Sequence, residues 1–142
     1  MIIFKNPSNE KPYMEFKKKY DEAILSNQTS LEAILISSFS PETNEVDSRY
    51  VNLKFIDDKE FIFFTNLKSP KSTQFKSHDQ ISAVLYWPNI NLQIRMKAKI
   101  KSVTREYSNT TAQPASCHQA SLTYSNQLNI NHSLARIAYG VS

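Results

Sequence analysis

The chain of 142 residues contains a single glycine, Gly140, and a single cysteine, Cys117. Average usage would give about ten glycines. The sequence therefore has no glycine-rich loop of the kind that holds the phosphates of dinucleotides or nucleoside triphosphates. One cysteine excludes an internal disulfide, and the three histidines do not stand at metal-ligand spacing, so we expect no metal site.

Long apolar runs are also missing. No stretch approaches the roughly 18 apolar residues of a membrane-spanning helix, and the first residues lack the order of charged, apolar and small residues that marks a signal peptide. We therefore expect a cytoplasmic protein without a membrane partner. Hydrophobic residues make up 40% of the chain and aromatic residues 11%, which is enough for one globular domain with a core.

The charge of the chain is moderately positive. Seventeen basic residues against 13 acidic ones give a net charge of +4 and a pI of about 9.1. This balance favours anionic partners, either small phosphates or nucleic acids. A lysine-rich solvated surface explains the same composition equally well.

The composition changes after Glu106. All 13 acidic residues and 16 of the 17 basic residues lie at or before it, and 21 of the 36 residues in 107–142 are Ser, Thr, Asn, Gln or Ala without a helix or strand period. Either a polar loop region precedes a short C-terminal segment, or truncation, frameshift or chimera has introduced unrelated sequence. We divide the chain into a domain at 1–106 and an atypical polar tail at 107–142, which we expect to be little buried and easily cleaved.

The first 106 residues predict a mainly β fold with two helices. Pro12 can open a helix over 12–27, whose apolar residues recur at helical spacing, and 69–78 suits a short helix. Predicted strands lie at 31–39, 50–56, 61–65, 81–87 and 92–101, with polar turns at 41–47 and 57–59. Within 92–101, apolar residues alternate strictly with polar and basic ones, so one face is core. Short turns between five strands indicate a small antiparallel barrel.

Three blocks follow one another at characteristic separations. They are Arg49-Tyr50-Val51-Asn52-Leu53-Lys54, then Phe61-Ile62-Phe63-Phe64-Thr65-Asn66 with Ser69 and Lys71, then Tyr86-Trp87-Pro88 with Gln93, Ile94 and Arg95. Together with Pro12, Phe16, Glu22 and Ala23 of the predicted N-terminal helix, they resemble the FMN-dependent pyridoxamine 5'-phosphate oxidases. The resemblance covers about residues 10–106.

This resemblance implies a split β-barrel homodimer that binds FMN in clefts at the subunit interface. It implies oxidation of pyridoxamine or pyridoxine 5'-phosphate to pyridoxal 5'-phosphate, with oxygen as acceptor. The FMN-binding residues that it implies are Arg49, Tyr50, Val51, Asn52, Leu53, Lys54, Phe64, Thr65, Lys71 and Gln93. Because no glycine loop is available, side-chain cations must supply much of the phosphate binding.

Individual roles follow from the same resemblance. Arg49 and Lys71 are candidates for the FMN phosphate, Thr65 adds a hydroxyl, and Gln93 matches a residue near the flavin ring. Lys54 matches the position that contacts the substrate phosphate, and no catalytic residue is assigned. On a regular strand Arg49 and Lys54 lie on opposite faces, which suits two different phosphates or requires a bulge between them. The simpler alternative for each of these polar residues is a solvated surface position.

The chain also departs from the family pattern. Pro70 stands where the family has an arginine, and we match none of the family's elements after Glu106. We therefore expect the oxidase activity to be impaired. Two alternatives are a general FMN-binding split-barrel reductase or flavin carrier, and a nucleic-acid-binding barrel that uses the basic residues of 92–101. The apolar stretches 31–39 and 61–64 exceed what one small barrel buries, so we expect a homodimer.

Overall fold

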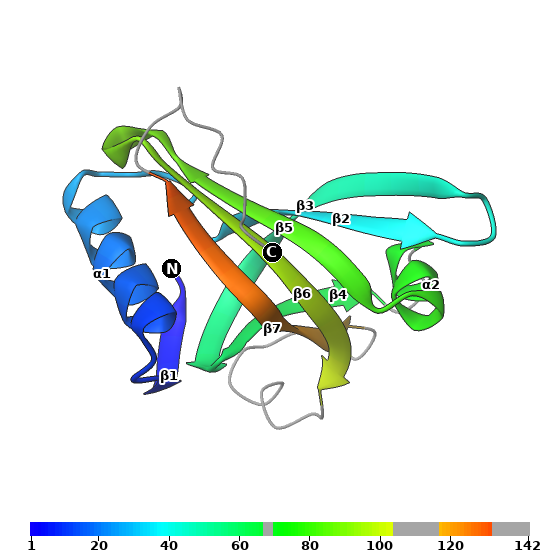
Figure 1. The fold of residues 1–142 in the computed structure, drawn as a ribbon. Helices are drawn as coiled ribbons and strands as arrows, with labels where there is room; N and C mark the ends of the chain where they lie inside the picture. The colour runs from blue at the N-terminus through cyan, green and yellow to red at the C-terminus, as the bar shows by residue number, and fades with distance from the viewer. Residues whose placement is uncertain (67–69, 104–116, 132–142) are drawn as a thin grey trace.

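A computed structural model describes residues 1–66, 70–103 and 117–131, and the side chains of 1–65 and 73–101. The described residues form seven strands and two α-helices, which are arranged as Figure 1 shows. The elements are β1 (Ile3–Pro7), α1 (Lys11–Leu25), β2 (Ala33–Ser40), β3 (Glu45–Asp58), β4 (Glu60–Asn66), α2 (Pro70–Ser77), β5 (Gln80–Trp87), a 3-10 turn η1 (Pro88–Ile90), β6 (Leu92–Val103) and β7 (Cys117–Asn131).

The strands form one curled sheet that closes on itself. Their order is β1-β3-β2-β5-β6-β7-β4, and β3 also pairs with β4. Six strands therefore surround the core, and each of these neighbouring pairs is antiparallel. Only β1 runs parallel to its neighbour, β3. The expected antiparallel split barrel with an N-terminal helix and a short helix between strands is confirmed.

Alternation along the strands builds the core. In β6 the apolar residues Leu92, Ile94, Met96, Ala98 and Ile100 are all buried, whereas Arg95, Lys97 and Lys99 are exposed. Their neighbours on β5 follow the same period, since Leu85 pairs with Ile94 and Ile81 with Ala98. A small barrel of this kind has room inside only for its own side chains.

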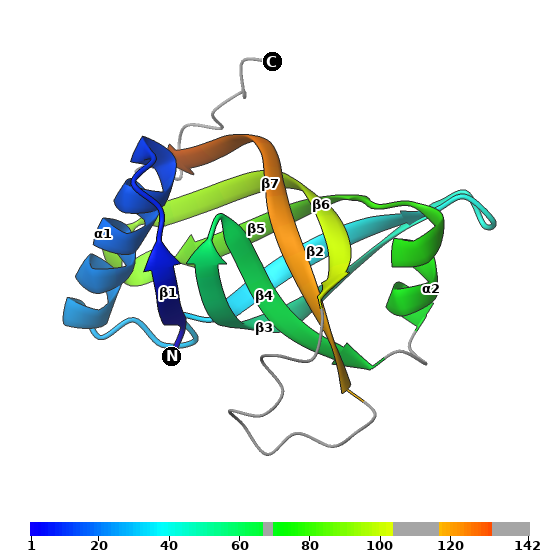
Figure 2. The same cartoon turned by 90° about the horizontal axis from the view of Figure 1, so that it is seen from below.

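The two helices close opposite ends of the barrel, α1 at the left of Figure 1 and α2 at the right, and Figure 2 shows the same arrangement from below. Phe16 of α1 packs edge-on against Phe61 and lies 5.7 Å from the Trp87 ring, between ring centroids. The Trp87 indole N–H donates a hydrogen bond to the Leu31 carbonyl at 3.2 Å. The apolar stripe of the predicted helix therefore packs against the core and covers this end of the barrel.

Two elements differ from the sequence predictions. Strand β3 begins at Glu45 rather than at residue 50, because its first residues pair with β2 as far as Ser40 and leave only 41–44 as a turn. Strand β1 was not predicted, since its apolar run is short. The Ile2 N–H donates to the buried hydroxyl of Tyr20 at 2.8 Å, which ties the N-terminus to α1.

A third difference is β7, which lies in the segment for which no regular period was found. Its backbone pairs with β4 on one side and β6 on the other. Strand pairing depends on backbone hydrogen bonds as well as on pattern. The domain boundary at residue 106 stays a prediction, and removal of β7 would uncover one edge each of β4 and β6.

Candidate functional site

Arg49 lies at the end of the barrel that α2 closes. It stands opposite Ile36 in the β2–β3 pairing and two residues before Val51 of the core, so its side chain points to the inner face of the sheet. Its guanidinium donates from Nη1 to Ser38 Oγ at 2.6 Å and from Nη2 to Gln74 Oε1 at 2.8 Å. Arg49 is the cation of a polar cluster that joins β2, β3 and α2.

Ser38 and Asp47 complete this cluster. Ser38 is 1% exposed, and its Oγ accepts from Arg49 while donating to Gln74 Oε1 at 2.6 Å. Asp47 Oδ2 accepts a bond from Arg49 Nη2 at 2.6 Å. We call Ser38, Asp47, Arg49 and Gln74 the Arg49 cluster. Because these hydrogen bonds hold the guanidinium from several sides, they fix its position at the barrel end.

Thr65 lies near the end of β4, two residues after Phe63 of the core and on the same inner face. Its side chain is 7% exposed, and its Oγ1 has no hydrogen-bond partner within the described part of the chain. A buried hydroxyl without a partner costs free energy, and such groups in native proteins point to a ligand, ion or water. Thr65 therefore marks a place where a polar ligand atom can bind.

Lys54 occupies a bulge in β3. Leu53 pairs with Phe63, whereas Phe55 pairs with Ile62, so β3 carries one extra residue there. The extra residue is Lys54 itself, so the bulge lies at Lys54 and not between Arg49 and Lys54. Lys54 is half-buried, and no ion pair is found for it among the described residues.

The other predicted FMN-binding residues divide into three groups. Val51 and Leu53 are buried in the core, so only their backbone groups can contact a ligand. Tyr50 and Asn52 are exposed on the outer face, and Phe64 is half-buried with its ring edge-on to Phe55 at 6.3 Å between centroids. These side chains do not join the Arg49 cluster.

Gln93 and Lys71 lie apart from each other in the fold. Gln93 is half-buried on the outer face of β6 and pairs with Tyr86 of β5. Arg49 pairs with Ile36 of β2, which in turn pairs with Ala83 of β5. Ala83 and Tyr86 are three positions apart on β5, about 10 Å along the strand. Lys71 falls in the first turn of α2, and its side chain lies outside the described residues. Within one copy of the chain, Arg49 and Thr65 lie at the α2 end of the barrel, whereas Gln93 does not.

Sequence reasoning missed three members of the Arg49 cluster. Ser38 had a detectable signal, because it follows Ile34 and Ile36 at alternate positions of a predicted strand and so falls on the core-facing side. Asp47 and Gln74 had none, since a turn and a polar helix contain many such residues.

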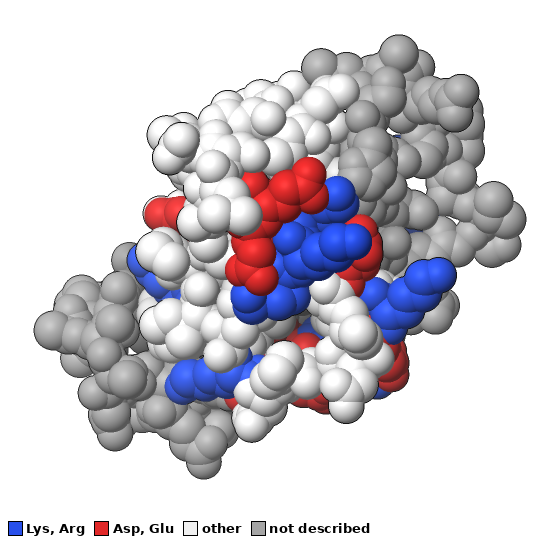
Figure 3. Space-filling model, turned by 90° about the vertical axis from the view of Figure 1, so that its left-hand side faces the viewer, with Lys and Arg blue, Asp and Glu red and all other residues white. Residues whose placement is uncertain are grey.

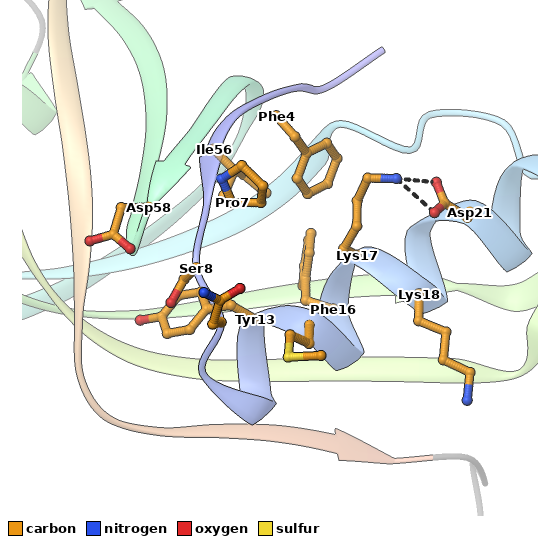
Figure 4. Close-up of a pocket in the computed structure, with 12 residues that line it drawn as sticks. Phe4, Pro7, Ser8, Tyr13, Phe16, Lys17, Lys18, Asp21, Ile56 and Asp58 are labelled. Atoms are coloured by element: carbon orange, nitrogen blue, oxygen red, sulfur yellow. Dashed lines mark hydrogen bonds and ion pairs between the residues drawn. The ribbon is translucent and has the colours of Figure 1, made fainter.

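A hollow of about 420 Å³ lies at the opposite end of the barrel, between β1 and α1 (Figure 4). Phe4, Phe16 and Ile56 line its apolar part, and Lys17 on its rim is paired with Asp21 at 2.6 Å. Figure 3 shows basic and acidic side chains side by side on this end of the molecule. None of the residues predicted for FMN lines the hollow.

Among the described residues, two groups have clearly shifted pKa values, and both lie away from the Arg49 cluster. Burial raises the pKa of the Tyr20 hydroxyl in α1, against the opposing effect of its hydrogen bond from Ile2. A hydrogen bond to Glu10 raises the pKa of Lys59, whose side chain is 43% exposed. These groups serve the packing of the N-terminal segment and offer no site chemistry.

The described ranges contain neither a cluster of metal ligands nor a helix that could span a membrane. No group of three or more His, Cys, Asp or Glu residues there could hold a metal ion. No described helix is long and apolar enough to cross a membrane.

Curated sequence relatives are oxidases. No family model matches the chain. The pyridoxine/pyridoxamine 5'-phosphate oxidase of Rhodopirellula baltica is 30% identical over 110 residues, which are 76% of this chain and 49% of that protein. That of Legionella pneumophila (strain Lens) is 31% identical over 97 residues, which are 68% of this chain and 45% of that protein. The chain thus spans about half the length of the curated relatives it matches.

Solved structures share the fold at low sequence identity. PhzG from Burkholderia lata 383, in complex with tetrahydrophenazine-1-carboxylic acid, has a TM-score of 0.71 at 15% identity and covers 80% of this chain and 76% of its own. A pyridoxamine 5'-phosphate oxidase-related, FMN-binding protein from Nostoc punctiforme has a TM-score of 0.64 at 13% identity, with 82% of each chain covered. HutZ, a heme storage protein from Vibrio cholerae, has a TM-score of 0.62 at 9% identity and covers 87% and 97%.

The solved structures show which fold this chain has, and the sequence relatives show to which family it belongs. The chain belongs to the pyridoxamine 5'-phosphate oxidase family and has the split-barrel fold of that family.

Proposed function

We propose that this chain binds FMN with its phosphate at the α2 end of the barrel. A flavin phosphate carries close to two negative charges and needs cations and N–H or O–H donors. Arg49 offers a guanidinium on a side chain that is 17% exposed, and Thr65 offers a buried hydroxyl without a partner in the described chain. Lys71 is the second residue of α2 and follows Thr65 closely in the sequence. The observation that carries the proposal is the unpartnered Thr65 Oγ1 in a member of this family.

The proposed reaction is the oxidation of pyridoxamine or pyridoxine 5'-phosphate to pyridoxal 5'-phosphate. FMN, when bound, supplies the acceptor for a hydride equivalent from the carbon that bears the amine or alcohol, and oxygen carries the electrons away as hydrogen peroxide. For the amine, water then hydrolyses the resulting imine and the nitrogen leaves as ammonia. Lys54, half-buried at the β3 bulge, holds the phosphate of the substrate. Gln93 contacts the flavin ring from the outer face of β6.

A homodimer is part of this proposal. Arg49 lies on the inner face at the α2 end and Gln93 on the outer face of another strand, so contacts from a second copy would complete one ligand site. Tyr50 and Val46, on the β2–β3 hairpin, are 71% and 69% exposed. Exposed apolar side chains of this size favour an interface. We infer that two copies pair through this hairpin.

Reconstitution and turnover test the proposal together. We expect purified protein incubated with FMN to retain a flavin absorbance after desalting, and to convert pyridoxamine 5'-phosphate with release of hydrogen peroxide. Because Pro70 replaces a family cation, turnover should be weak. A colourless protein that cannot be reconstituted with FMN would overturn the cofactor assignment.

A general FMN-binding barrel is the second candidate function. It is favoured by the Nostoc punctiforme protein, which is described only as oxidase-related and FMN-binding, and by the loss of a cation at Pro70. Such a protein needs Arg49 and Thr65 but not Lys54. The nucleic-acid alternative receives no such support, because Lys99 and Lys101 on β6 are paired with Asp79 and Glu60.

A further inference from the structure

We propose that the Asp47 carboxylate is a built-in competitor for the anion that binds Arg49. In the chain without ligand it neutralises the guanidinium, and it thereby lowers the affinity of the site for phosphate esters. This inference rests on the proposed phosphate site at Arg49. It adds a residue that sets the strength of that site.

The hydrogen bonds of Arg49 carry the argument. A guanidinium has five N–H donors, two of them on Nη2. Asp47 Oδ2 and Gln74 Oε1 accept from Nη2, at 2.6 and 2.8 Å, and Ser38 Oγ accepts from Nη1 at 2.6 Å. An anion that binds Nη2 must displace Asp47 or Gln74. An anion that leaves Asp47 in place, whether it displaces Gln74 or uses the two remaining donors, lies within a few ångströms of the carboxylate, and the like charges repel.

Asp47 differs from the other acceptors in the cluster. Ser38 is buried and uncharged, and Gln74 is half-buried and uncharged, so neither repels an anion. The Asp47 side chain is 56% exposed and stands two residues before Arg49 on the same face of β3. It can turn into solvent when an anion arrives, while Ser38 and Gln74 keep the guanidinium in place.

The ion pair contributes little to folding by comparison. Exposed pairs between side chains are commonly worth little free energy of unfolding, because water screens them and the side chains lose freedom. Removal of the Asp47 charge therefore leaves the barrel intact. The main effect of removing this charge is that the surroundings of Arg49 become more positive, which favours phosphate binding.

The test compares Asp47→Asn with Glu45→Gln in the full chain. Glu45 lies two residues away on the same face of the same strand, and its substitution changes the net charge equally without touching Arg49. FMN is titrated by quenching of its fluorescence. We expect FMN to bind Asp47→Asn about tenfold more tightly than wild type, and Glu45→Gln within about twofold of wild type. Riboflavin, which lacks the phosphate, should bind all three proteins equally.

Each other outcome has a defined meaning. If wild type binds FMN and Asp47→Asn and Glu45→Gln have equal FMN affinities, the proposed role of Asp47 as a competitor is wrong. The proposed FMN-binding function is not affected by that result. Weaker binding by Asp47→Asn would overturn the competitor role too, because Asp47 would then be a support for Arg49. If none of the proteins binds FMN, both proposals are wrong. Asp47→Ser, which also removes the charge, should reproduce the gain, and unfolding temperatures within about 2 °C of wild type show that every variant is folded.

Discussion

Ser38 Oγ accepts a hydrogen bond of 2.6 Å from Arg49 Nη1, which joins β2 to β3 under α2. Ser38 follows Ile34 and Ile36 on the core-facing side of β2, where a third apolar residue would suit the packing. The barrel instead places a buried hydroxyl there and orients a cation with it. Ser38 therefore contributes both to the packing of the barrel and to the proposed phosphate site.

Ser38→Ala tests how far this bond supports the fold and the site. The substitution leaves donors of Arg49 without a buried partner, so we expect the free energy of unfolding to fall by about 1–2 kcal/mol and the affinity for FMN to fall several-fold. Chemical denaturation and an FMN titration measure the two effects. Ser37→Ala is the matched control, because Ser37 bonds only to Ser48 on the exposed face. A change in Ser38→Ala no larger than in this control would contradict the account.

Thr65→Val should separate stability from binding. Valine has nearly the same shape and removes the buried hydroxyl that has no partner in the described chain, so the ligand-free protein should gain up to about 1 kcal/mol of unfolding free energy. Affinity for FMN should fall at the same time. Thr65→Ser, which keeps the hydroxyl, should retain more affinity than valine. A valine variant that is less stable and binds FMN normally would show that Thr65 has only a structural role.

The extent to which the sequence predicted this molecule depends on the signal in each region. Strand β6 was predicted correctly because strict alternation, as at Leu92 and Ile94, leaves only one face for the core. Helix α1 was predicted from its apolar spacing. In contrast, β7 lies in a stretch of small and polar residues without a period, and its place follows from pairing with distant strands.

The site was predicted by residue type rather than by arrangement. The resemblance selected Arg49 and Thr65, which the structure places at one end of the barrel, whereas the bulge at Lys54 itself was not predicted. Gln74 could not be found, because its role depends on how α2 packs against β2. Such long-range contacts have no local sequence signal.

Lys54→Ala distinguishes the oxidase from a general flavin-binding barrel. Loss of the cation should raise the KM for pyridoxamine 5'-phosphate by about tenfold to a hundredfold, because a charged hydrogen bond to the substrate is removed. FMN affinity should change little. Steady-state kinetics measure the effect, with Lys18→Ala, an exposed residue at the α1 end, as control. Unchanged kinetics would remove Lys54 from the substrate site.

Pro70→Arg should strengthen FMN binding. It restores a cation where the family pattern has an arginine, in the first turn of α2, and we expect an affinity gain of about three- to tenfold. Pro70→Gln controls for the loss of proline without adding charge. Equal affinities for the arginine and glutamine variants would show that position 70 does not face the phosphate.

FMN titration of wild type beside Arg49→Ala and Arg49→Lys tests the central claim most directly. The account predicts saturable FMN binding by wild type, at least a tenfold loss in Arg49→Ala, and partial retention in Arg49→Lys, which keeps the charge but not the planar fork. Riboflavin should bind all three proteins equally. FMN binding that is the same in wild type and Arg49→Ala, or absent from all three, would contradict the account.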